Sequence, residues 1–122
     1  MKKNKSFIKS LVNALLGIRA VSAKERNFRF HIFASIAVVI LCIVARVETI
    51  HFLFVALAIF FVIATELINS AIEAVVDLIT NGRPHPLAKF AKDAAAGAVL
   101  VAAFFAIIVG AVVASSVIAR FL

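Results

Sequence analysis

The sequence predicts an all-α integral membrane protein, and three features of the chain support this prediction. Apolar residues make up 65% of the 122 residues, and the mean hydropathy is +1.16, whereas soluble domains are usually about half apolar. Three long apolar runs follow one another along the chain, and a basic, amphipathic segment precedes them. A second domain would not fit in this length, so we expect a single membrane domain over residues 1–122.

Residues 5–20 are expected to form an amphipathic helix on the membrane surface. Apolar side chains recur here with the spacing of one helix face, and lysine, serine and asparagine fill the other side. A basic polar face opposite an apolar face suits a helix that lies in the headgroup plane. Packing on a protein core is the alternative, but the chain offers no soluble core. The apolar members are Phe7, Ile8, Leu11, Val12, Leu15, Leu16 and Ile18.

Three membrane-spanning helices are predicted at about residues 28–47, 50–80 and 89–120. Each run reaches the ~20 residues that a helix needs to cross the hydrocarbon core. The link between the first two runs is short. The link between the second and third runs, residues 81–86, contains one glycine and two prolines, which end a helix and turn the chain.

The distribution of lysine and arginine predicts the orientation of these helices. Eight basic residues precede the first apolar run, and Arg83, Lys89 and Lys92 lie in or just after the second link. Only Arg46 and Arg120 lie at the opposite ends of the helices. The positive-inside rule then places the N-terminus and the loop around Gly82 in the cytoplasm and the C-terminus outside. A basic arm beside apolar runs indicates attraction to a membrane surface, so no nucleic-acid partner is expected.

Polar residues interrupt the second apolar run at Glu66, Asn69, Glu73 and Asp77. At about 100° per residue, the three carboxylates fall within an arc of roughly 40° on one helix face, with Asn69 on its flank. Ionisable residues at membrane depth are energetically expensive and usually functional. We therefore favour a functional site over ion pairs that only hold helices together.

Charged residues from the other helices are expected at the same level of the membrane. Glu25 precedes the first span, and Lys92 and Asp93 begin the third. Carboxylates at such a boundary can hold a hard cation such as Mg²⁺, whose shell is completed by water and substrate phosphates, and a further carboxylate can act as a general base. These groups suit phosphoryl transfer from a soluble nucleotide to an alcohol dissolved in the bilayer.

Two other classes of function remain as alternatives. A small cation- or drug-coupled transporter would use Glu66 as its carrier carboxylate, but transporters place such acids near the midplane, and here the acids gather toward one face. A non-catalytic assembly subunit would not bind nucleotide. The sequence contains no glycine-rich loop with GK[ST] and no evident Ser–His or Cys–His pair. The single cysteine, Cys42, provides neither a disulfide nor a metal site.

The motif Glu-x-x-Asn-Ser-Ala-Ile-Glu-Ala-Val-Val-Asp spans residues 66–77, with Gly-Ile-Arg-Ala at 17–20, Glu-Arg-Asn-Phe-Arg at 25–29 and Ala-Lys-Asp at 91–93. In order and spacing this set resembles the prokaryotic diacylglycerol kinase family over nearly the whole chain. The resemblance implies a homotrimeric membrane kinase with one amphipathic surface helix and three spanning helices per subunit. It also implies active sites between subunits, near the cytoplasmic face, that use MgATP.

The resemblance implies roles for individual residues. Glu66 would be the general base that takes the proton of the lipid hydroxyl, and Asn69 would support this base and its substrate. Glu25 and Glu73 correspond to metal-binding carboxylates that also contact ATP. Asp77 is expected to support the structure. The further expected ATP contacts are Lys92 and Asp93 and, in a loop whose length and residues differ from the family's, Arg83 and His85.

Departures from the family pattern concern the lipid substrate. The chain has no tryptophan, and His31 follows Asn-Phe-Arg-Phe where the diacylglycerol kinase branch has a glutamate. Both features are similar to the undecaprenol kinase branch, which phosphorylates a long polyprenol. We therefore expect an undecaprenol kinase, with a diacylglycerol kinase as the alternative. His31 is expected to contact the lipid, and the alternative is that it only lines the cytoplasmic end of the first spanning helix. Ser6 and Asn13 replace two nucleotide-contacting side chains of the other branch, and those roles are not transferred.

Overall fold

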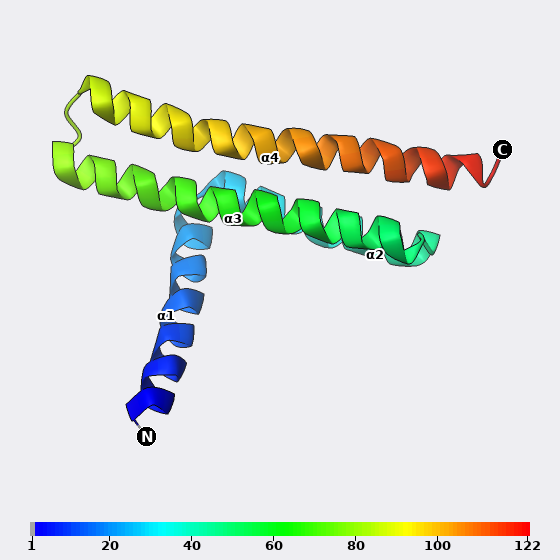
Figure 1. The fold of residues 1–122 in the computed structure, drawn as a ribbon, viewed down its shortest axis with the longest axis horizontal. Helices are drawn as coiled ribbons and strands as arrows, with labels where there is room; N and C mark the ends of the chain where they lie inside the picture. The colour runs from blue at the N-terminus through cyan, green and yellow to red at the C-terminus, as the bar shows by residue number, and fades with distance from the viewer. Residues whose placement is uncertain (1) are drawn as a thin grey trace.

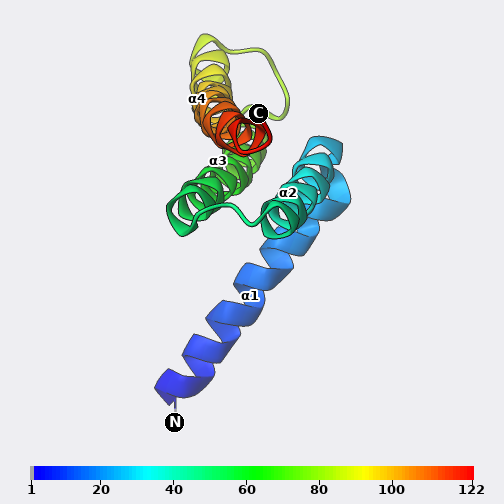
Figure 2. The same ribbon diagram turned by 90° about the vertical axis from the view of Figure 1, so that its right-hand side faces the viewer.

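The computed structural model describes the backbone of residues 2–122 and the side chains of residues 6–122. The described chain folds into four helices, α1 (Lys2–Lys24), α2 (Arg26–Ala45), α3 (Thr49–Thr80) and α4 (Pro86–Ala119). α3 lies in the middle and packs against α4 on one side and α2 on the other, and α1 projects away across their direction (Figures 1 and 2). The all-α fold class is the one that the sequence predicts.

The helix boundaries differ from the expected ones mainly in the first and last helices. The helix expected over residues 5–20 continues to Lys24 and stops at Glu25, whose backbone is extended (φ −102°, ψ 111°). The last helix begins at Pro86 rather than near residue 89, because proline fits the first helical position and the His85 ring caps the helix. The two middle helices begin and end within two residues of the expected limits.

All four helices are long and apolar enough to cross a membrane, α1 over Ser6–Lys24 included. The large apolar side chains of α1 are exposed along its length, and α1 contacts the other helices only near its C-terminal end (Figure 1). Length and composition therefore do not decide whether α1 crosses the membrane, and its location on the surface stays a prediction.

Two tight reversals make α3 antiparallel to both α2 and α4. α2 ends at Arg46, which adopts a left-handed conformation (φ 53°), and the amide of Val47 bonds to the carbonyl of Cys42 at 3.2 Å. α3 ends at Asn81 and Gly82, both with positive φ, and the Gly82 amide bonds to the Asp77 carbonyl at 3.2 Å. Asparagine and glycine tolerate this conformation better than other residues, so the chain turns directly after the carboxylate-bearing part of α3.

Arg120 ties the far end of α4 to the far end of α2. Its guanidinium donates to the backbone carbonyls of Ala45 and Arg46, the latter at 3.3 Å. The last carbonyls of a helix have no partner within the helix, and this side chain supplies donors to two carbonyls at the end of α2. The sequence predicts only that Arg120 lies at the end of the helices opposite the Gly82 loop, and not that it contacts α2.

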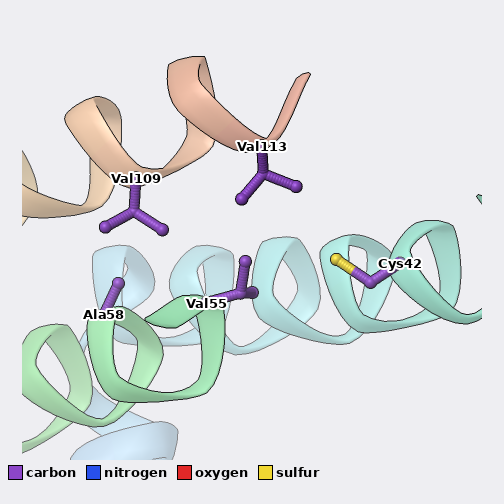
Figure 3. Packing of buried hydrophobic residues seen from close by; sticks show 5 residues of the cluster. All are labelled: Cys42, Val55, Ala58, Val109 and Val113. Atoms are coloured by element: carbon purple, nitrogen blue, oxygen red, sulfur yellow. The ribbon is translucent and has the colours of Figure 1, made fainter. Parts of the chain in front are cut away.

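The apolar core joins α3 to both of its neighbours through small and medium-sized side chains. Figure 3 shows Val55 and Ala58 of α3 facing Val109 and Val113 of α4, with Cys42 of α2 beside them. Small residues allow helices to approach closely in lipid, and the further buried members Ala95 and Ala102 continue this contact along α4. Many large apolar side chains elsewhere are exposed, as expected for surfaces that face lipid or another chain.

The lengths of the helices determine where the polar residues lie. α3 has 32 residues and α4 has 34, which at 1.5 Å per residue gives about 48 and 51 Å, against about 30 Å for the hydrocarbon core. α2 has only 20 residues. At the end that carries the Gly82 loop, α3 and α4 extend past the junction of α1 with α2 (Figure 1), and near this loop Asp77 of α3 pairs with Lys92 of α4.

We predict that Val113→Ala destabilises the helix bundle and that Val112→Ala does not. Val113 is 7% exposed within the core, whereas its neighbour Val112 is 55% exposed, so only the first substitution removes packing contacts. The expected loss is about 1–2 kcal/mol. Unfolding by SDS titration in mixed micelles measures it, and equal losses for both variants would contradict the packing described above.

Candidate active site

Glu66 is the most deeply placed acid of the site, and it contacts His31 of α2. Its side chain is 11% exposed, and its Oε1 lies 3.2 Å from Nε2 of His31, whose side chain is 32% exposed. The other oxygen, Oε2, is buried without a hydrogen-bond partner. Buried polar atoms nearly always have a hydrogen-bond partner. The hydroxyl of a bound molecule could supply the hydrogen bond that Oε2 lacks.

Asn69 and Glu73 continue the polar face toward the Gly82 loop, about one and two turns beyond Glu66. Nδ2 of Asn69 donates to Oε1 of Glu73 at 3.4 Å, a long hydrogen bond between residues four apart on the helix. Oδ1 of Asn69 is buried and has no partner. Two oxygens, Oε2 of Glu66 and Oδ1 of Asn69, thus remain unsatisfied on the same face of α3.

Glu25 approaches α3 from the side of α1. It is the single non-helical residue between α1 and α2, its side chain makes no capping hydrogen bond, and it is half-buried. It lines a cavity with Leu67, Ser70 and Ala74 of α3, and its carboxylate is close enough to Glu66 for the two charges to interact. The structure therefore brings the junction between α1 and α2 to the level of the acids.

Asp77 and Lys92 form an ion pair between α3 and α4. Nζ of Lys92 lies 2.7 Å from Oδ1 of Asp77, and both side chains are substantially exposed. Lys92 also lies near enough to Glu73 for their charges to attract. Asp93, the next residue, pairs with Lys89 one turn earlier on α4. Lys89 is not among the site residues predicted from the sequence, although its spacing of four from Asp93 is typical of a helical ion pair.

A cavity of about 630 Å³ lies where α3, the loop and α4 meet. This volume falls in the range typical of small-ligand sites. Nδ1 of His85 accepts the Leu87 amide at 3.1 Å, so this ring caps α4 while it lines the cavity. Charged and polar lining residues predominate: Asp77, Arg83, His85, Lys89, Lys92 and Asp93.

The predicted site residues therefore divide into two neighbouring groups. Glu66, Asn69, Glu73 and His31 form the deeper group, with Glu25 beside it, and Arg83, His85, Lys92 and Asp93 line the cavity at the loop. Among the described residues, no three histidine, cysteine or acidic side chains gather closely enough to hold a metal ion by themselves. A hard cation held by one or two carboxylates, with phosphate and water as its other ligands, is still compatible with this donor set.

A second, apolar cavity of about 190 Å³ begins beside the deeper group. His31 and Ser35 stand at its polar edge, and the remaining lining comes from apolar residues of α2, α3 and α4 and from Gly110. This arrangement places apolar space directly next to the His31–Glu66 contact. The sequence offered no signal for that contact, because it joins residues on two different helices.

Comparisons with known proteins identify the class as a membrane-embedded lipid kinase. The family model described as prokaryotic diacylglycerol kinase matches residues 12–114, a span that includes every predicted site residue. The chain belongs to the prokaryotic diacylglycerol kinase family. It is therefore a multi-pass membrane protein whose reaction uses a nucleotide and a lipid, and neither the transporter nor the assembly-subunit alternative is supported.

The individual relatives are named as kinases of two different lipids. The chain is 47% identical to the undecaprenol kinase of Bacillus subtilis over 104 residues, which cover 85% of this chain and 84% of that protein. It is 45% identical to a diacylglycerol kinase of Synechocystis over 97 residues, covering 80% of this chain but 55% of that longer protein. The diacylglycerol kinase of Escherichia coli K12 is 34% identical over 102 residues, covering 84% and 83%.

Proposed function

We propose that this protein is an ATP-dependent undecaprenol kinase that produces undecaprenyl phosphate at the cytoplasmic face of the membrane. The observation that carries the proposal is the buried Glu66, which has one oxygen without a partner and lies beside an apolar cavity that begins at His31. The similarity to the Bacillus subtilis enzyme over most of both chains supports the same substrate. The similarity to the Synechocystis enzyme favours diacylglycerol as the alternative substrate.

In the proposed reaction, Glu66 acts as the general base. Its Oε2 accepts the proton of the lipid hydroxyl while the hydroxyl oxygen attacks the γ-phosphorus of ATP. The bond from that phosphorus to the β,γ-bridging oxygen breaks, and ADP leaves. Asn69, whose Oδ1 also lacks a partner, lies one turn away and would hold the hydroxyl or the phosphoryl group. The lipid phosphate, ADP and one proton account for all atoms and charges, and no covalent enzyme intermediate is needed.

Glu25 and Glu73 are proposed as the carboxylates that bind Mg²⁺ together with ATP. Both are half-buried. Glu25 is close enough to Glu66 for their charges to interact, and Glu73 lies about two turns from Glu66 on α3. A site of one or two carboxylates completed by phosphates and water is typical for this ion. When bound, Mg²⁺ would neutralise charge on the phosphates. The hydrogen bond from Asn69 to Glu73 would orient one of these carboxylates.

The cavity at the loop is proposed to receive the nucleotide. Arg83, Lys89 and Lys92 supply positive charge around it. Lys92 now pairs with Asp77, and Asp77 would keep it aimed at the site until a phosphate replaces the carboxylate as its partner. Asp93 and the free ring nitrogen of His85 would contact other parts of ATP.

We further propose the assembly and orientation that the family resemblance and the charges suggest. The exposed apolar surfaces and the open space around Gly97 of α4 suit packing against other copies in a homotrimer. α1 would lie on the cytoplasmic surface of the membrane because its direction crosses that of the other helices (Figure 2). The N-terminus and the Gly82 loop would then be cytoplasmic and the C-terminus outside.

We expect faster phosphate transfer to undecaprenol than to diacylglycerol. Labelled ATP and the purified protein in mixed micelles, with the two lipids at equal mole fractions, measure this directly as kcat/KM. A preference for undecaprenol supports the proposal. Equal or faster transfer to diacylglycerol would contradict the proposed substrate while leaving the kinase assignment intact.

We expect Glu66→Gln to lower kcat by about 10²- to 10⁴-fold, the usual contribution of a general base. Glutamine keeps the shape of the side chain but cannot take the proton. Binding of a fluorescent ATP analogue with Mg²⁺ should change little. Glu48→Gln is the matched control, because Glu48 lies at the other end of α3 and its side chain makes no capping bond. Near wild-type turnover of Glu66→Gln would rule out Glu66 as the base.

We expect Glu73→Ala to raise the Mg²⁺ concentration needed for half-maximal activity, or to abolish activity, because a proposed metal ligand is lost. A Mg²⁺ titration at constant free ATP measures the change, again with Glu48→Gln as the control. If the titration curve of Glu73→Ala matches that of the wild type, Glu73 does not bind the metal.

A further inference from the structure

His31 is in direct contact with Glu66, the proposed general base. Its Nε2 is 3.2 Å from Oε1 of Glu66, at the long end of the range of N–H···O distances. Among the described residues, this is the one polar side-chain contact between α2 and α3. It lies deep in the helix bundle, where a carboxylate would otherwise have neither water nor a partner.

The two oxygens of Glu66 have different surroundings. Oε1 faces His31, whereas Oε2 is buried and has no hydrogen-bond partner. A donor on Oε1 would restrict rotation of the carboxyl group and leave Oε2 as the acceptor. The apolar cavity that starts at His31 is also lined by Val62, one turn before Glu66 on α3.

The imidazole has one further contact within its own helix. The ring of Phe30 meets it edge to face, with ring centres 5.7 Å apart. Oγ of Ser35 donates to the His31 backbone carbonyl at 2.6 Å. His31 is thus a half-buried residue whose ring contacts both Phe30 and Glu66.

We propose that His31 is a positioning residue for Glu66. Its Nε2–H donates to Oε1 and holds Oε2 toward the hydroxyl of the lipid substrate. This inference rests on the proposed role of Glu66 as base. It assigns His31 a different role from the direct lipid contact that the sequence analysis expects.

The experiment compares His31→Ala, His31→Gln and a control, His51→Asn, in micelles. The Gln side-chain nitrogen reaches about as far as Nε2 and can donate to Oε1, whereas Ala cannot. His51 lies in the first turn of α3, at the end away from Glu66. We expect His31→Ala to lower kcat about 10- to 100-fold with less than about a twofold change in either KM. His31→Gln should recover most of the loss, and His51→Asn should behave as the wild type.

Three kinetic outcomes would overturn the proposal. A raised KM for the lipid with kcat unchanged would make His31 a lipid contact. Equal losses for His31→Ala and His31→Gln, together with lower thermal stability, would make it a structural tie between α2 and α3. Unchanged kinetics of His31→Ala would show that Glu66 needs no positioning by this residue.

Nitrogen NMR of the histidine rings gives a readout that does not depend on turnover. We expect Glu66→Gln to shift the Nε2 resonance of His31 and to leave that of His51 unchanged. If the shift occurs but Glu66→Gln stays active, the proposed base is wrong although the contact exists. If Glu66→Gln is inactive but the His31 resonance does not move, the base stands and the positioning role is wrong.

Discussion

The structure depends on keeping carboxylates inside an apolar helix bundle, where an unpaired charge is costly. Each acid on the polar face of α3 is met by a different partner. Glu66 contacts His31, Glu73 accepts from Asn69, and Asp77 pairs with Lys92. Burial decreases in the same order, from a buried to a half-buried to an exposed residue. One helix face thus leads from an apolar environment to water, and the two substrates of the proposed reaction would approach it from its opposite ends.

This gradient exists because α3 is longer than the neighbour that covers it. α2 begins at Arg26, near the level of the acids, whereas α3 and α4 continue together to the loop. Past the start of α2, Asp77 of α3 pairs with Lys92 of α4, and the neighbouring face of α3, at Leu67, Ser70 and Ala74, shares a cavity with α1. The helical repeat places the acids on one face, and the difference in helix length decides which of them is buried.

Local patterns made much of this architecture predictable from sequence. The spacing of the acids places them on one face, and the glycine and prolines of residues 81–86 require a turn, because both effects act within one or two helix turns. The contacts of Arg120 with the end of α2, and of His31 with Glu66, join residues far apart in sequence and depend on how helices pack. For the same reason the sequence does not predict the pairing of Lys92 with Asp77, although it predicts an ATP contact for Lys92 and a structural role for Asp77.

A single chain surrounds the proposed site incompletely and leaves the half nearest the Gly82 loop open. Asp77 and Lys92 are 54% and 41% exposed, and the loop cavity is lined by exposed residues. Phosphoryl transfer to an alcohol competes with transfer to water, so the reacting groups must be shielded from water when they meet. A bound nucleotide and lipid would provide part of that cover. The proposed neighbouring subunits would provide the rest, and they would also bury apolar side chains that a single chain exposes, so one contact would close the site and hold the assembly together.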